Sequence, residues 1–165
     1  MAAMLRTLTT VEFEGAQDVE LQRQPVGFDL TVQSIHSFAA EGVLGLGNDV
    51  RKLPDLRELL WSGDEPLLLS PGGYLVNYNE IVDVPLDSAG IVLPRSSLLR
   101  CGGTLHTALW EPGYRGRGYG LLTVHNTLAL HRHARIAQYI MMRLEQAVEL
   151  GYTGVYQGEN VAAQS

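Results

Sequence analysis

The sequence predicts an all-β protein, built as a sandwich or a barrel. After Ser62 the chain breaks into short runs rich in Val, Ile, Leu and Tyr, separated by Gly, Pro, Asn and Asp. The first group of residues favours strands and the second favours turns. Six such runs at close spacing are typical of sandwiches and barrels. The length of 165 residues predicts one domain over 1–165.

The strands are expected in the following order. A first strand is predicted over 28–35, where Phe28, Leu30 and Val32 alternate with polar residues. The six later runs are YLVNY at 74–78, EIVDVPL at 80–86, GIVLP at 90–94, TLHTALW at 104–110, YGLLTVHN at 119–126 and RIAQYIMMRL at 135–144.

Two short helices complete the prediction. The segment Leu53–Trp61 is expected to be helical, because its leucines fall on one helical face and Pro54 suits a first turn. A second helix is expected after Pro94, with Ser96 or Ser97 as its N-terminal cap.

Composition excludes several partners and settings. The net charge of −6 argues against general nucleic-acid binding, and no apolar run reaches the length of about 20 residues that a membrane helix needs. The start, MAAMLRTLTTVEFEG, lacks the pattern of a signal peptide. Cys101 is the single cysteine, so an internal disulfide is excluded and a reducing, cytoplasmic setting is expected.

Positive charge is concentrated in one window. Seven arginines and a single acid, Glu111, lie between Arg95 and Arg143, so this window carries +6 while the rest of the chain carries −12. Guanidinium groups suit phosphate and carboxylate ligands. The window therefore predicts an anionic ligand, with ordinary ion pairs to the acidic remainder as the alternative.

Two local patterns are interpreted as structural. The glycines of 113–120, GYRGRGYG, are followed by a β-like run instead of a helix, which excludes a Rossmann loop and favours a hairpin turn. His131 and His133 are expected to alternate on one strand face. This spacing can bind a metal, but no third ligand is near in sequence, so zinc is not expected.

Several motifs occur in a characteristic order: VGFDLTV, LSPGGYLV, PRSSLLR, HTALWEPGYRG, RIAQ and GVYQGEN. In this order they resemble the dUTPase and dCTP deaminase superfamily, and they are most similar to its archaeal-type dUTPase branch. The resemblance extends from Val26 to Asn160 and is weakest over the insert at 40–65.

The resemblance implies a distorted, jelly-roll-like β-barrel (a β-clip) with one or two short helices. It implies a homotrimer with three active sites at subunit interfaces, and a deoxypyrimidine nucleoside triphosphate as substrate. It also implies Mg²⁺, held mainly by the triphosphate and water instead of by protein ligands. The C-terminal segment 151–165 would be mobile or close over the site.

The same resemblance assigns the site residues. Arg95, Ser96 and Ser97 would bind phosphates, with support from Arg100. The hairpin would read the base largely through backbone groups, and Tyr114 would pack on the deoxyribose. The remaining substrate-binding positions are His106, Thr107, Ala108 and Trp110 in the hairpin, and Gln138, Tyr156 and Gln157 in the later motifs.

Two positions decide the expected chemistry. Thr123 stands where the deaminases of this superfamily carry a catalytic glutamate, and a hydroxyl cannot shuttle protons near neutral pH, so deamination is disfavoured. Glu111 stands where the triphosphatases carry an aspartate that activates water. The expected reaction is hydrolysis of dUTP to dUMP and pyrophosphate. Deamination of dCTP, a bifunctional route, and a non-catalytic nucleotide sensor are the alternatives, and the choice between uracil, cytosine and modified bases stays open.

Overall fold

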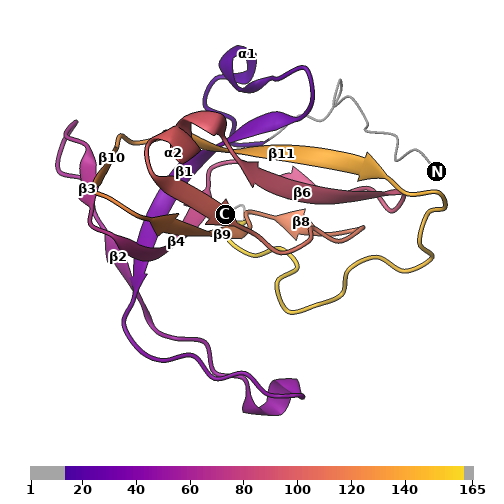
Figure 1. Cartoon of the computed structure of the whole chain (residues 1–165). Helices are drawn as coiled ribbons and strands as arrows, with labels where there is room; N and C mark the ends of the chain where they lie inside the picture. Colours follow the sequence, from indigo (N-terminus) through magenta and orange to yellow (C-terminus); the bar gives the residue numbers. More distant parts are fainter. Residues whose placement is uncertain (1–13, 162–165) are drawn as a thin grey trace.

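The computed structural model describes residues 14–161 and shows a mostly β-stranded molecule (Figure 1). Its main sheet has seven strands, and all its pairings are antiparallel. Along the sheet the strands are ordered β6 (Ser88–Pro94), β11 (Arg135–Arg143), β1 (Phe28–Phe38), β4 (Gly72–Tyr78), β9 (Tyr119–Val124) and β7 (Gly103–His106), and β2 (Leu56–Leu59) pairs with the far end of β1. The expected all-β barrel is confirmed.

Two short ribbons lie beside the main sheet. β10 (Leu128–Leu130) pairs with β3 (Leu67–Leu69), and β5 (Val82–Asp83) pairs with β8 (Arg115–Gly116). The glycine-rich stretch is therefore not a simple hairpin, because β8 and the following β9 pair with different strands. The predicted strands at 80–86 and 104–110 are correspondingly shorter than expected.

The core lies inside the curved sheet. Fully buried side chains come from β1, β4, β9 and β11, and they include Leu30, Ile35, Val76, Tyr78, Leu122, Ile136 and Tyr139. The predicted alternation of β1 is wrong for its first half, because all of the residues 28–32 are buried. The physical reason is that both polar side chains have partners inside the protein: Asp29 pairs with Arg95, and the hydroxyl of Thr31 donates to the buried Glu80.

The helix predicted over Leu53–Trp61 is wrong. This segment contains β2, whose Leu59 and Leu56 pair with Ile35 and Phe38 of β1. Pairing with the free edge of β1 overrides the local helical pattern, and the leucines that would have formed a buried helical face are partly or wholly exposed. A 3-10 turn, η1 (Asn48–Val50), precedes it.

Residues 14–161 contain two short α-helices, α1 (Val19–Gln22) and α2 (Ser96–Arg100). The side chain of Asp18 caps α1 by accepting a hydrogen bond from the backbone N–H of Leu21 at 3.0 Å. The predicted helix after Pro94 is confirmed, but its serine cap is wrong: Arg95 is the N-cap, and no side-chain capping bond forms.

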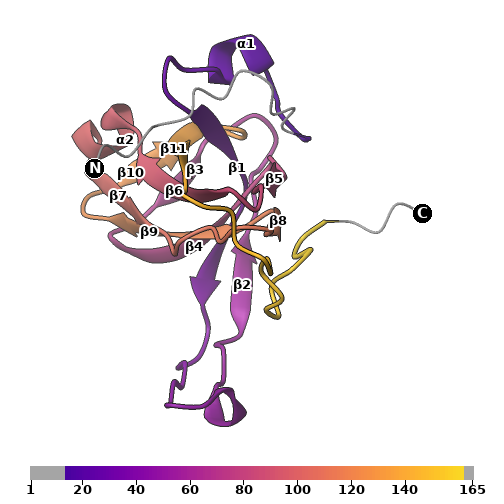
Figure 2. The same cartoon turned by 90° about the vertical axis from the view of Figure 1, so that its right-hand side faces the viewer.

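Two extensions leave the barrel. Residues 36–59, here called the arm, form a long hairpin that projects away from the sheet at the bottom of Figure 2. Residues 151–161, the C-terminal segment, have turns but no strand and run beside β8. Within residues 14–161 none of the helices is long and apolar enough to cross a membrane.

Candidate functional site

The turn that follows Trp110 presents the carboxylate of Glu111. The backbone oxygen of Glu111 accepts a hydrogen bond from the N–H of Tyr114 at 3.1 Å, and Gly113 has φ of 80°. Proline at the second position and a left-handed glycine at the third are the requirements of a type II turn. Pro112 and Gly113 therefore fix the backbone, and the side chain of Glu111 is left exposed.

Beside this turn lies a cavity of about 300 Å³, here called the hairpin cavity. This volume is at the lower end of the range for small-molecule sites. Its lining is largely aromatic and contains two carboxylates. The lining residues are Ala108, Leu109, Trp110, Glu111, Tyr114, Gly118, Tyr119, Tyr152, Tyr156 and Glu159.

The aromatic rings of the hairpin cavity pack edge to face. Trp110 contacts Tyr114 with ring centroids 5.4 Å apart, and Tyr114 contacts Tyr152 at 5.7 Å. The hydroxyl of Tyr114 donates a hydrogen bond to the carboxylate of Glu159 at 2.9 Å. Burial raises the pKa of Tyr114, and it also raises the pKa of Glu159. The hydroxyl of Tyr114 thus stays neutral and donates its hydrogen bond to the C-terminal segment.

The C-terminal segment is hydrogen-bonded to the hairpin. The side chain of Gln157 donates to the backbone oxygen of Gly113 at 2.8 Å and accepts from the N–H of Arg115 at 2.9 Å. The N–H of Gly158 donates to the oxygen of Arg115 at 2.8 Å, and that of Arg117 donates to the oxygen of Glu159 at 3.0 Å. This series of bonds places Tyr156 and Glu159 at the cavity.

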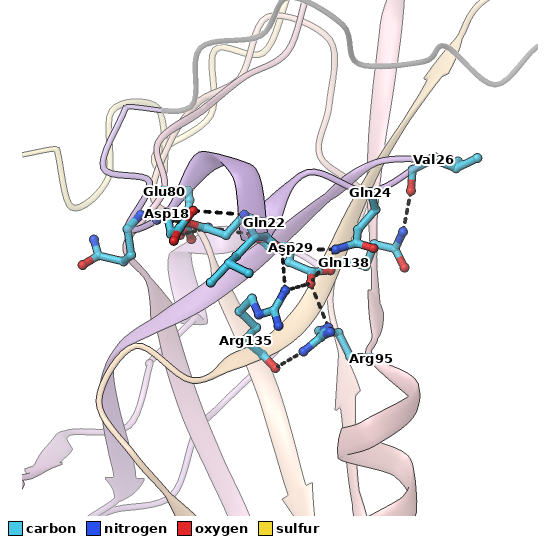
Figure 3. A network of polar contacts seen from close by, with 11 residues as sticks. Asp18, Gln22, Gln24, Val26, Asp29, Glu80, Arg95, Arg135 and Gln138 are labelled. Carbon is cyan, nitrogen blue, oxygen red and sulfur yellow. Dashed lines mark hydrogen bonds and ion pairs between the residues drawn. The ribbon is translucent and has the colours of Figure 1, made fainter.

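A second polar group, here called the arginine cluster, lies where β1, β11 and the end of β6 meet (Figure 3). Asp29 of β1 is opposite Gln138 of β11. The carboxylate of Asp29 forms an ion pair with Nε of Arg95 at 2.9 Å and a longer one with Nη1 of Arg135 at 3.4 Å. Gln138 donates its amide to the backbone oxygen of Val26.

Asp29 is almost fully buried, so its ionisation depends on these arginines. Burial raises the pKa of Asp29, and the charges of Arg95 and Arg135 oppose this effect. Arg95 also donates to the backbone oxygen of Arg135 at 3.2 Å, which fixes its guanidinium group at the start of α2. Asp29 therefore orients the guanidinium group of Arg95, one of the predicted phosphate-binding residues.

The predicted phosphate-binding residues of α2 lie next to this cluster. Ser96 and Ser97 form the first turn of α2 and are exposed, and Arg100 lies in its last turn. Arg100 donates to the backbone oxygen of Ser96 at 3.3 Å.

The hairpin cavity and the arginine cluster are well separated in the chain. Gly90 of β6 forms a bridge with Trp110 at the cavity, whereas Arg95 lies five residues further along. At the usual rise of a strand this corresponds to roughly 17 Å. Of the predicted residues, the structure brings Ala108, Trp110, Glu111, Tyr114 and Tyr156 to the cavity. Arg95 and Gln138 are at the other group, and His106 and Thr107 line neither.

Within one chain, the seven arginines of the basic window contact separate groups. The anionic ligand inferred from this window stays a prediction. Arg115 pairs with Glu14 at 2.8 Å, and Arg143 pairs with Asp87 at 3.6 Å. The alternative that was left open, pairing with acids outside the window, accounts for these residues and for the buried Asp29. Arg117 donates to backbone oxygens, and Arg132 stacks on Trp61.

Sequence reasoning gave no role to Asp29 or Glu159, although both stand inside the quoted motifs VGFDLTV and GVYQGEN. The available signal was an acid that is the one charged residue of its motif. His131 and His133, expected on one strand, lie instead in the connection between β10 and β11, and His133 contacts Asn79 at 3.0 Å.

The described residues contain no group of three or more His, Cys, Asp or Glu side chains arranged to hold a metal. A Mg²⁺ ion accompanying a triphosphate fits this donor set, because it takes most of its ligands from phosphates and water. Thr123 lies in β9 between Gly73 and Thr104 of the neighbouring strands, so no acid or base stands at that position.

The fold and the two groups of site residues indicate first a protein family. The family model described as dCTP deaminase-like matches residues 5–144, and the chain belongs to that family. A crystal structure of 2′-deoxycytidine 5′-triphosphate deaminase from Agrobacterium tumefaciens superposes with a TM-score of 0.60. It covers 80% of this chain and 43% of the deaminase chain at 23% identity, which supports the fold alone.

Archaeal relatives are considerably more similar in sequence. A protein of Methanosarcina acetivorans named probable deoxyuridine 5′-triphosphate nucleotidohydrolase is 45% identical over 149 residues, which cover 89% of this chain and 87% of the relative. The deoxyuridine 5′-triphosphate nucleotidohydrolase of Methanocaldococcus jannaschii is 40% identical over 140 residues, covering 84% and 89%.

Proposed function

We propose that this protein hydrolyses dUTP to dUMP and pyrophosphate. The observation that carries the proposal is the exposed carboxylate of Glu111 at the rim of an aromatic cavity of nucleoside size, with Thr123 in place of a deaminase's glutamate. The names of the archaeal relatives support dUTP as the substrate.

Glu111 acts as the general base in this proposal. It accepts a proton from the water that attacks the α-phosphorus, a contribution typically worth about 10²–10⁴-fold in rate. The turn of Pro112 and Gly113 fixes the backbone from which the Glu111 side chain projects.

The phosphate tail binds to Arg95, Ser96, Ser97 and Arg100. Arg95 is already held by Asp29, so little side-chain freedom is lost on binding. Gln138 and Gln157 contribute amide donors. When bound with the nucleotide, Mg²⁺ offsets negative charge on the phosphates.

The proposed active form is a homotrimer with shared sites. Arg95 lies five residues, or roughly 17 Å at the usual rise of a strand, beyond Gly90, which forms a bridge with Trp110 at the hairpin cavity. This spacing along β6 supports an assembly with shared sites. A neighbouring copy would supply the phosphate-binding group for each cavity.

The first test is the release of pyrophosphate from dUTP in the presence of Mg²⁺. Glu111→Gln should lower kcat by at least about 100-fold with little change in the dissociation constant for dUTP, because the amide cannot accept the proton. Glu149→Gln, which changes an exposed glutamate outside both groups, is the matched control. Full turnover by Glu111→Gln would remove this carboxylate from the mechanism.

The same assay separates the alternative functions. Ammonia release from dCTP would establish deamination and contradict the role inferred from Thr123. Tight dUTP binding in calorimetry without pyrophosphate release would establish a nucleotide sensor instead of an enzyme. Parallel incubations with each deoxynucleoside and ribonucleoside triphosphate would determine the base and sugar preference.

A further inference from the structure

The arm is the part of the chain to which the proposed function gives no role. It is nevertheless an ordered hairpin. The N–H of Ala39 donates to the oxygen of Asp55 at 2.8 Å, and Val43 and Lys52 exchange two backbone hydrogen bonds of 2.8 and 2.9 Å. These bonds extend the pairing of β1 with β2 toward the tip.

The two sides of the arm also meet at its tip. A Cβ added at Gly45 would lie 2.2 Å from Cγ2 of Val50, so the two sides of the tip are in close contact. The 3-10 turn η1 ends at Val50, and the N–H of its C-cap residue, Arg51, donates to the oxygen of Asn48 at 3.3 Å. This bond fixes the backbone of Arg51 relative to the turn.

Arg51 differs from the other charged residues of the arm. Glu41, Asp49, Lys52, Asp55, Arg57 and Glu58 are all exposed, whereas Arg51 is partly buried. The reason is a contact outside the arm: the guanidinium carbon of Arg51 lies 5.8 Å from the centroid of the Tyr156 ring. This geometry is that of a cation–π interaction.

Tyr156 connects this contact to the hairpin cavity. Its ring lines the cavity, while its own backbone takes part only in turns of the C-terminal segment. The hydrogen bonds that attach this segment to the hairpin are made by the neighbours of Tyr156, namely Tyr152, Gln157, Gly158, Glu159 and Asn160. The contact with Arg51 therefore adds to these bonds and acts on the ring of Tyr156 itself.

We propose that Arg51 is a positioning residue, which holds Tyr156 at the hairpin cavity and so makes the arm part of the nucleotide site. The arm thus reaches back to the C-terminal segment of its own chain. This inference rests on the proposed function for its kinetic consequence, but its structural consequence holds without it.

The kinetic test is Arg51→Ala. Losing a partly desolvated cation–π contact should raise KM for dUTP about fivefold and leave kcat within about twofold, because Arg51 does not touch the reacting atoms. Arg51→Lys should recover part of the loss. Arg57→Ala removes an exposed arginine of the same arm and should leave KM unchanged.

A double-mutant cycle identifies the partner. Arg51→Ala should have no further effect on KM in a Tyr156→Leu background, where the ring is absent, but should keep its effect in a Tyr156→Phe background. An equal effect of Arg51→Ala with and without the ring would overturn the proposal.

Amide hydrogen exchange gives a readout that does not need turnover. Exchange over residues 151–160 should be faster in Arg51→Ala than in wild type or Arg57→Ala, and unchanged exchange would overturn the inference. If wild type fails to hydrolyse dUTP while this difference is found, the proposed function fails and the role of Arg51 stands.

Discussion

At the scale of single residues, the buried carboxylate of Glu80 is the least expected feature. Glu80 has no exposed surface and accepts hydrogen bonds from Gln22 at 2.7 Å, from the Thr31 hydroxyl at 2.5 Å and from the Thr31 N–H at 2.9 Å. Burial raises the pKa of Glu80 above the usual 4.5, because desolvation outweighs these donors. The folded chain therefore binds a proton at Glu80 more tightly than the unfolded chain does.

This pKa shift predicts how stability changes with pH. Between 4.5 and the raised pKa, the folded state holds more protons than the unfolded state, so the free energy of unfolding falls as pH rises through that window. Glu80→Gln should remove this component and lower stability at pH 7 by about 1–3 kcal/mol, because the amide leaves one buried donor without an acceptor. Urea unfolding across pH 4–8 measures both effects.

Glu65→Gln, which changes an exposed glutamate, is the control for these measurements and should leave both the stability and its pH dependence as in wild type. Identical curves for Glu80→Gln and wild type would contradict the assignment.

Whether the role of a residue can be predicted from the sequence depends on how far away in the chain its partners lie. Glu111 and Tyr114 are assigned by the resemblance to the superfamily, and the structure places both at the cavity. Asp29 and Glu159 were missed, because their importance comes from partners 66 and 45 positions away in sequence. Such pairings exist only once the sheet has formed.

At the scale of elements, the C-terminal segment contributes residues to the site but no strand to the barrel. The main sheet ends at Arg143, while Tyr152, Tyr156, Gln157 and Glu159 all lie beyond it. Deletion of residues 151–165 should therefore preserve the β-type circular dichroism spectrum. It should also lower kcat/KM for dUTP at least about 100-fold, because the hairpin loses the groups that complete its cavity.

A shorter deletion, of residues 162–165, is the matched control and should keep near-normal turnover, since it leaves all of the contacts described between residues 14–161 and the hairpin in place. Full activity after the longer deletion would contradict a role for the segment.

Elements were predictable where local pattern and long-range pairing agree. The strands β1, β4, β6, β9 and β11 were expected close to where they occur, because their apolar runs fill the core. The segment Leu53–Trp61 has leucines at helical spacing, but the free edge of β1 offers it backbone hydrogen bonds, and a strand forms. Local periodicity carries no information about that edge.

At the scale of the whole molecule, the proposed trimer makes a specific prediction. Glu111→Gln and the double variant Ser96→Ala, Ser97→Ala should each be inactive, because one lacks the base and the other lacks phosphate contacts. Both serines are exposed, so the double variant should fold. When the two variants are co-refolded, random mixing should restore about a quarter of the shared sites.

Recovered pyrophosphate release, together with a trimer in sedimentation analysis, would support sites shared between chains. Absence of recovery in mixed trimers would show that each chain carries a complete site. Wild-type protein that sediments as a monomer at assay concentration would contradict the assembly itself.

The contact between Gly113 and Gly151 limits how this protein can change. A Cβ on Gly113 would lie 2.8 Å from Cα of Gly151, and a Cβ on Gly151 would lie 3.0 Å from Cα of Gly113. A larger residue at one position cannot be compensated by a smaller residue at the other, because both positions are already glycine. Directed evolution for altered substrate range would consequently have to retain both glycines and vary the residues that surround them.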